Sequence, residues 1–201
     1  MAQKVIITIG RQFGSGGVEV ADELSKRLGF PVYDKELIAK AAQDSGFSPD
    51  HFEKNDERKS LFSFSSIFSS EGYMSDSAIF NMQCETIRNI ADQESAIIVG
   101  RCSDYVLRDM ENVFNVFLTG SHEDRVQRVM RRDRISKDEA IAKIEKKDKS
   151  RSEYYNYYTF GNWGVASSYH LCIDTSVYGI KGAAEIIINA LTAKGVIDAK
   201  A

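Results

Sequence analysis

A glycine-rich stretch near the start of the chain, IGRQFGSGGVEV at residues 9–20, has the composition of a loop that binds anions. It places four small residues, Gly14, Ser15, Gly16 and Gly17, between a β-branched run and a helical pattern that opens at Val18. Glycines let backbone N–H groups converge, and a helix start adds unpaired donors with a partial positive charge. The stretch therefore favours phosphate binding; a tight strand-to-helix turn is the plainer alternative, but it needs fewer small residues.

The loop lacks the lysine of the phosphate-loop pattern G-x-x-x-x-G-K-[ST]. In the register set by Gly16, the lysine would stand at Gly17 and the hydroxyl residue at Val18. Arg11 is the best local substitute, because it lies in the same loop. We predict that Arg11 reaches back over the phosphates and supplies the missing charge.

Dinucleotide binding is a competing interpretation of the same stretch. Gly14-x-Gly16, followed by Asp34 after the next predicted strand, imitates the G-x-G-x-x-G fingerprint with its distant acid. However, Glu19 takes the place of the third glycine. The glycines also begin five residues beyond Ile9, whereas the fingerprint starts almost at the strand end.

A second chemical signal is basic: the stretch EDRVQRVMRRDR holds five arginines within ten residues. They are Arg125, Arg128, Arg131, Arg132 and Arg134. On a helix, Arg125, Arg128 and Arg132 share one stripe because their spacings are three and four. Guanidinium groups suit phosphate oxygens, and several can gather around a transferred phosphoryl group. Ion pairs with the neighbouring acids of a solvated helix would explain one or two of the five.

The rest of the chain supplies the elements that must position these residues. Strands are expected at residues 5–9, 31–33, 96–101, 113–120 and 170–176, and residues 10–17 form a loop. Helical patterns occupy residues 18–28, 37–42, 79–90 and 180–191, and two further helices follow the caps Ser121 and Ser136. This alternation predicts an α/β fold with a parallel sheet between helices. Ligands in such folds bind at the strand ends, where Asp34, Arg101, Asp104 and Ser121 stand.

Residues 44–75 do not resemble a core element. Serines interleave with aromatic and aliphatic residues in SLFSFSSIFSS, after the charged HFEKNDERK. A helical insert over the site and a surface hairpin are equally good interpretations.

Composition and charge exclude several classes of protein. A chain of 201 residues with 43% hydrophobic residues fits one globular domain, and the net charge of −3 argues against nucleic-acid binding. The three cysteines lack C-x-x-C spacing, which favours reduced thiols in a cytoplasm, and no apolar run is long enough to cross a membrane. The histidines show no metal-site spacing, so the metal ligands are unknown. The oligomeric state is not indicated.

Together the stretches resemble the cytidylate kinase-like family, a branch of the P-loop nucleoside monophosphate kinases. The matching stretches are ITIGRQFGSGG, GFPVYDKELI, IIVGRCSDYVLRD, RISKDEAIAKIEKKDKSRSEYYNYYT, NWG and IDTSVYGIKGA. The resemblance implies a three-layer P-loop kinase fold over residues 1–201. It also implies a helical monophosphate-binding insert at residues 44–75 and an arginine-rich lid at residues 125–160.

The resemblance also assigns roles to residues. Residues 14–17, with Val18, would hold the phosphates of ATP, and Arg128, Arg131 and Arg132 would be lid arginines. The expected acceptor-binding residues are Asp34, Lys35, Arg101, Asp104, Asp148 and Arg151. The expected substrates are ATP with Mg²⁺ and CMP or dCMP; Asp34, Glu19 and Ser15 are the nearby oxygen candidates for the metal.

Three positions depart from the family pattern. Well-characterised cytidylate kinases have lysine at the position of Gly17 and aspartate at that of Cys102, and this branch usually has arginine where Val18 stands. Two other functions therefore stay open. One is a P-loop kinase of another small acceptor, and the other is a nucleotide-binding protein with little catalytic turnover.

Overall fold

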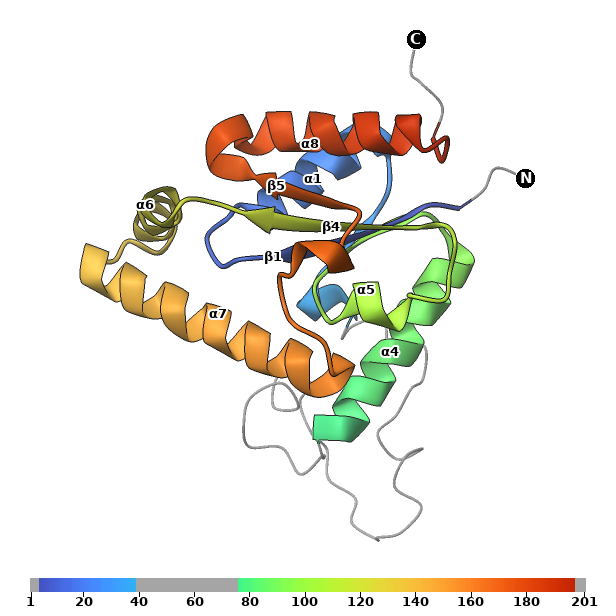
Figure 1. Ribbon diagram of the computed structural model, residues 1–201, viewed down its shortest axis with the longest axis horizontal. Helices are drawn as coiled ribbons and strands as arrows, with labels where there is room; N and C mark the ends of the chain where they lie inside the picture. The colour runs from blue at the N-terminus through green and yellow to red at the C-terminus, as the bar shows by residue number, and fades with distance from the viewer. Residues whose placement is uncertain (1–3, 39–75, 198–201) are drawn as a thin grey trace, which may run out of the picture.

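The sheet has five strands, all paired in parallel, in the order β2-β3-β1-β4-β5 (Figure 1). The computed structural model describes residues 4–38 and 76–197. The strands are β1 (Ile6–Arg11), β2 (Val32–Tyr33), β3 (Ala96–Val99), β4 (Val113–Thr119) and β5 (Leu171–Asp174). In this order, the chain passes from β1 to β2 at one edge of the sheet and from β4 to β5 at the opposite edge, so the connections that follow the neighbours β1 and β4 run in opposite directions. The carboxyl ends of these two neighbours thus form the crevice where ligands bind in α/β sheets.

Helices cover both faces of the sheet, which confirms the predicted fold class. Helices α1 (Gly17–Leu28) and α8 (Thr175–Ala193) pack on one face, where Ile7 and Ile9 are buried (Figure 1). Helices α4 (Asp76–Gln93) and α5 (Ser103–Val106) pack on the other face, where Ile6 and Ile98 are buried. Burial on both faces explains why the strands are continuously apolar.

Helices α6 (His122–Asp133) and α7 (Lys137–Thr159) lie beyond the carboxyl ends of the strands (Figure 1). They pack together through a small apolar cluster that includes Val126, Val129 and Ile144. Both predicted caps are confirmed: the side chain of Ser121 accepts a hydrogen bond from Asp124 N, and Ser136 forms a capping box with Glu139. The predicted lid region is therefore made of these two helices.

Several predicted boundaries are wrong. β1 runs through Gly10 to Arg11, where a loop was expected, and β3 ends at Val99 and not at Arg101. A Cβ atom on Gly10 would lie 2.7 Å from Phe117 Cδ2, so this glycine marks a close approach inside the strand and not its end. Helices α4 and α8 begin earlier than expected, and a left-handed residue, Gly179, interrupts α8.

Other predictions lie beyond the described residues. The helix expected from Leu37 begins at Lys35, and its continuation past residue 38 is not described. The proposed insert at residues 44–75 is likewise outside the described residues. Within the described ranges, no helix has the length and apolar character needed to span a membrane.

Candidate functional site

The glycine loop, residues 12–16, joins β1 to α1 at the centre of the sheet edge. Gly14 and Gly16 have φ values of 81° and 82°, a left-handed conformation that other residues rarely adopt. Gly16 occupies the N-cap of α1, and no side chain caps the helix there. The first backbone N–H groups of α1 therefore remain available to an anion, as phosphate binding at a helix start requires.

Ser15 shapes the loop from inside. Its side chain is fully buried, and Oγ donates a 2.9 Å hydrogen bond to the carbonyl of Gln12. Its own carbonyl accepts a 2.7 Å hydrogen bond from Thr175 Oγ1, at the start of α8. The Ser15 hydroxyl is thus directed at the protein backbone, which disfavours it as a ligand for a metal ion.

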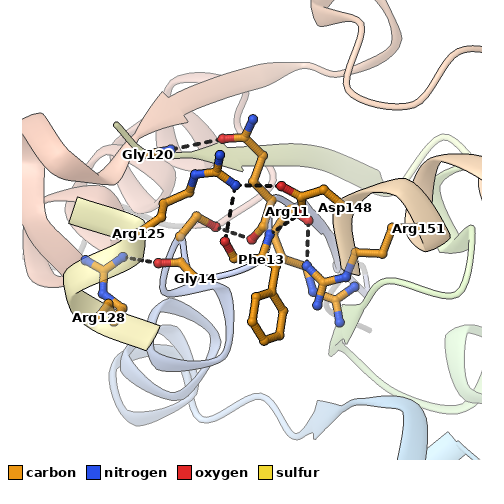
Figure 2. A network of polar contacts seen from close by, with 10 residues as sticks. Arg11, Phe13, Gly14, Gly120, Arg125, Arg128, Asp148 and Arg151 are labelled. Carbon is orange, nitrogen blue, oxygen red and sulfur yellow. Dashed lines mark hydrogen bonds and ion pairs between the residues drawn. The ribbon is translucent and has the colours of Figure 1, made fainter. Parts of the chain in front are cut away.

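Helices α6 and α7 hold the glycine loop through polar side chains (Figure 2). Arg128 Nη1 donates to the carbonyl of Gly14 at 2.6 Å. Asp148 accepts from the backbone N–H of Phe13 at 2.6 Å and forms a 2.6 Å ion pair with Arg125. Arg125 also donates to the Phe13 carbonyl at 3.3 Å. The two predicted lid helices therefore contact the loop backbone directly.

Arg125 is a site residue that the sequence marked only as part of a basic stripe. Its side chain is buried, and its Nε atom is the one buried side-chain nitrogen or oxygen without a partner among the described residues. The ion pair with Asp148 compensates most of the charge that burial leaves without water. Arg125 thus anchors α6 to α7 and to the loop.

Arg11 extends from the end of β1 between two glycines. A Cβ atom on Gly17 would lie 2.8 Å from Arg11 Cγ, and a Cβ atom on Gly100 would lie 2.0 Å from Arg11 Nη1. Burial, and then the positive charges of Arg151 and Arg101, lower the pKa of Arg11 to about 9. The surroundings therefore disfavour the charged form of Arg11, and a bound anion would offset the cost of burial and of repulsion by the other two arginines.

Arg101 follows β3 in an unusual backbone turn. Gly100, Arg101 and Cys102 are consecutive residues with φ values of 78°, 60° and 55°. A left-handed conformation costs a residue other than glycine about 1–3 kcal/mol, and such strain gathers at functional sites. The turn places the Arg101 guanidinium 4.8 Å from the centre of the Tyr154 ring.

Gln83 is a second residue that the sequence did not reveal. It is buried on α4, and its Oε1 accepts hydrogen bonds from Arg101 Nη1 at 3.3 Å and from Tyr154 Oη at 3.2 Å. A glutamine within an amphipathic helix carries no sequence signal of this kind. Its amide joins α4, α7 and the end of β3.

Arg151 lies between the glycine loop and Arg101. Its Nη1 donates to the carbonyl of Arg11 at 3.0 Å, and its guanidinium lies 5.3 Å from the centre of the Phe13 ring. Arg132 lies 4.8 Å from the same ring. Burial lowers the pKa of Arg151, and the carboxylate of Asp148 opposes that shift. The Phe13 ring thus contacts one guanidinium from α6 and one from α7.

Four guanidinium groups at this site form no ion pair with a carboxylate of the described residues. Among residues 4–38 and 76–197, the arginines that form no ion pair with a carboxylate include Arg11, Arg101, Arg128 and Arg151. Arg11, Arg128 and Arg151 lie around the loop (Figure 2), and the start of α1 there has no side-chain cap. Such an arrangement is complementary to several phosphate groups held close together.

The other predicted site residues lie in varied surroundings. Asp34 Oδ1 caps the helix at residues 35–38 by accepting from the N–H groups of Glu36 and Leu37 at 3.0 Å. Lys35 has its pKa lowered by burial and then by the charge of Arg101, which places it beside the cluster. Asp104 accepts a 2.7 Å hydrogen bond from Tyr155 Oη, and burial raises its pKa.

Three predicted residues lie in solvent. Val18 is 47% exposed beside the loop. Arg131 is exposed on α6. Arg132 is also exposed, but it pairs with Asp133 and covers the Phe13 ring.

Within the described ranges, no three His, Cys, Asp or Glu side chains are grouped to hold a metal ion. The Mg²⁺ ligands stay unassigned.

Known proteins resemble this chain over most of its length. The sequence profile of the cytidylate kinase-like family matches residues 6–177. A cytidylate kinase from Pyrococcus abyssi is 26% identical over 189 residues, which cover 93% of each chain. These matches confirm the resemblance that the motifs indicated.

Solved structures give the same result for the fold. An uncharacterised protein from Eubacterium ventriosum is 30% identical, with a TM-score of 0.75 over 94% of this chain and 99% of that chain. Shikimate kinase from Bacteroides thetaiotaomicron, at 13% identity, has a TM-score of 0.57 over 93% of this chain and 98% of that chain. The predicted P-loop kinase fold is therefore confirmed.

Proposed function

The chain belongs to the cytidylate kinase-like family, and on that premise we propose that it is an ATP-dependent kinase of CMP or dCMP. The observation that carries the proposal is the convergence, around the glycine loop, of guanidinium groups that form no ion pair with a carboxylate of residues 4–38 and 76–197. Phosphoryl transfer between nucleotides needs alignment and charge neutralisation more than covalent chemistry from the protein. The site supplies both.

The proposed reaction joins the γ-phosphorus of ATP to a phosphate oxygen of the monophosphate. The bond from the γ-phosphorus to the oxygen that bridges it to the β-phosphate breaks, and ADP leaves with that electron pair. Residues 14–17 and Val18 hold the ATP phosphates through the loop and the start of α1. Arg11, Arg128, Arg131 and Arg132 neutralise the transferred group. The acceptor is bound by Asp34, Lys35, Arg101, Asp104, Asp148 and Arg151.

The loop fits ATP on two structural grounds. The start of α1 has no side-chain cap, and Gly16 brings the loop backbone close to Arg128 and Ile180. Mg²⁺ would enter with the nucleotide and would neutralise phosphate charge during transfer, and Asp34 and Glu19 are the nearby side chains of the protein that would hold it.

The test offers the purified protein ATP and Mg²⁺ with CMP, dCMP, UMP or AMP, and follows ADP and diphosphate formation. We expect diphosphate from CMP or dCMP at a rate well above that from AMP. Arg27→Ala is the matched control, because Arg27 lies in the last turn of α1, at the end of the helix remote from the loop. It should leave turnover unchanged.

A second function is favoured by one observation, the glycine at the lysine position. If ATP binds but none of the four monophosphates is phosphorylated, the CMP kinase proposal is wrong. The protein would then be a nucleotide-binding protein with little turnover or a kinase of another acceptor. Offering a wider panel of phosphorylated and hydroxylated acceptors separates these two.

A further inference from the structure

Two departures from the phosphate-loop pattern lie at complementary positions. In the register set by Gly16, the first glycine of G-x-x-x-x-G-K-[ST] falls on position 11, and the lysine falls on position 17. This chain has Arg11 at the first and Gly17 at the second. A long cation and a glycine have therefore exchanged places.

The geometry explains why the two changes come together. β1 places alternate residues on one face, so Arg11 shares the face of Ile7 and Ile9, which is covered by α1. A Cβ atom on Gly17, the first residue of α1, would lie 2.8 Å from Arg11 Cγ and 3.1 Å from Arg11 Cβ. These atoms belong to the base of the Arg11 side chain and not to its mobile end. Position 17 can therefore carry a side chain only if Arg11 moves.

Gly100 completes the space for Arg11. A Cβ atom there would lie 2.0 Å from Arg11 Nη1, and its φ of +78° would strain any other residue. The guanidinium consequently lies over the end of β3, next to Arg101 and Arg151, whose charges lower its pKa. The Arg11 side chain extends from the last residue of β1, and its guanidinium lies between the glycine loop and the predicted acceptor-binding residues Arg101 and Arg151.

We propose that Arg11 carries the charge of the missing lysine in exchange for position 17, and that Gly17 is the positioning residue that leaves room for it. The inference rests on the proposed function, because the charge acts on the phosphates of a bound nucleotide. It adds that the loop retains a positively charged side chain, which comes from position 11 in place of position 17. It also gives Gly17 a reason to be glycine that is independent of backbone donors.

The test is a double-mutant cycle of Arg11→Ala and Gly17→Ala, with a swap variant, R11G/G17K. ATP affinity, inorganic tripolyphosphate affinity, turnover with CMP and the melting temperature are measured for each. We expect R11A to weaken tripolyphosphate binding about tenfold or more, as loss of one charged contact predicts. G17A should weaken it in the wild-type background and have a clearly smaller effect in the R11A background, where only the 3.1 Å approach to the Cβ atom of residue 11 remains.

The swap variant gives the sharper comparison. R11G should lose affinity, G17K should lose affinity because the lysine stem collides with Arg11, and R11G/G17K should recover at least tenfold over R11G. Equal, additive effects of G17A in both backgrounds would overturn the proposal, as would an R11G/G17K variant no better than R11G. If the wild-type protein phosphorylates no monophosphate, the proposed function fails, while the affinity cycle still decides the exchange.

Discussion

Two groups of arginines meet at the glycine loop, and they differ in what balances their charge. Arg125 is buried and forms an ion pair of 2.6 Å with Asp148, which also accepts from the loop backbone. Arg11, Arg101 and Arg151 converge on the other side of the loop, and none of them forms an ion pair with a carboxylate of the described residues. Arginine side chains thus occur in this site both with and without a carboxylate in an ion pair.

The difference indicates two roles. The charge of a paired, buried arginine is already balanced, so its loss leaves the charge of its partner uncompensated and lowers the stability of the protein. An unpaired arginine repels the neighbouring arginines while no anion is bound. Its loss therefore weakens ligand binding but removes charge repulsion from the unliganded protein. Stability and activity should therefore respond in opposite ways to mutation of the two groups.

The largest effect is expected at the unpaired group. Arg101→Ala removes a guanidinium that Gln83 and Tyr154 orient but that forms no ion pair with a carboxylate in the part of the chain that the structure describes. The KM for CMP should rise about 100-fold, equivalent to about 2.7 kcal/mol of lost binding. The melting temperature should stay the same or rise, because repulsion with Arg11 disappears. Steady-state kinetics and thermal unfolding check both parts, and a destabilised variant with an unchanged KM would reverse the assignment.

The paired group should show the opposite pattern. Asp148→Asn keeps an acceptor for the Phe13 N–H but leaves Arg125 buried without a counter-charge. We expect the free energy of unfolding to fall by about 2 kcal/mol, less than for a fully buried pair because Asp148 is partly exposed. Denaturant titration measures it. If the free energy of unfolding is unchanged in D148N, the ion pair with Arg125 does not anchor the loop, whatever the effect on the KM for CMP.

The smallest effect is expected at the residue that links the two groups. Phe13→Leu keeps apolar contact with the α6–α7 cluster but removes the ring that faces Arg132 and Arg151. Two cation–π contacts of about 0.5–1 kcal/mol each predict a loss of ATP affinity of about five- to thirtyfold, with little change in melting temperature. Titration calorimetry with ATP decides, and unchanged affinity would show that the ring does not orient the two arginines.

The sequence predicted the sheet, the loop and the basic helix because each depends on a local pattern. β-branched runs mark β1, β3 and β4, and the capping box at Ser136 marks the start of α7. It could not predict which arginines are paired. Arg125 and Arg128 lie on one stripe, yet one pairs with Asp148, twenty-three residues away, and the other contacts a loop carbonyl.

The other features that the sequence did not predict depend on contacts between residues far apart in the chain. α5 has four residues and follows three left-handed residues, a turn that no periodic pattern announces. Gly10 looked like the end of β1 but lies within it, because Phe117 of the neighbouring strand needs the space of its side chain. Gln83 became visible only when α4 was placed beside Arg101.

The most direct test of the account is the transfer of labelled γ-phosphate from ATP to CMP by the wild-type protein and by Arg11→Ala. Arg11 is the cation on which the interpretation of the lysine-free loop depends. We predict labelled CDP from the wild type, and a rate reduced about 100-fold or more in R11A at an unchanged or higher melting temperature, as loss of one transition-state charge contact suggests. No labelled CDP from the wild type, or an undiminished rate in R11A, would contradict the account.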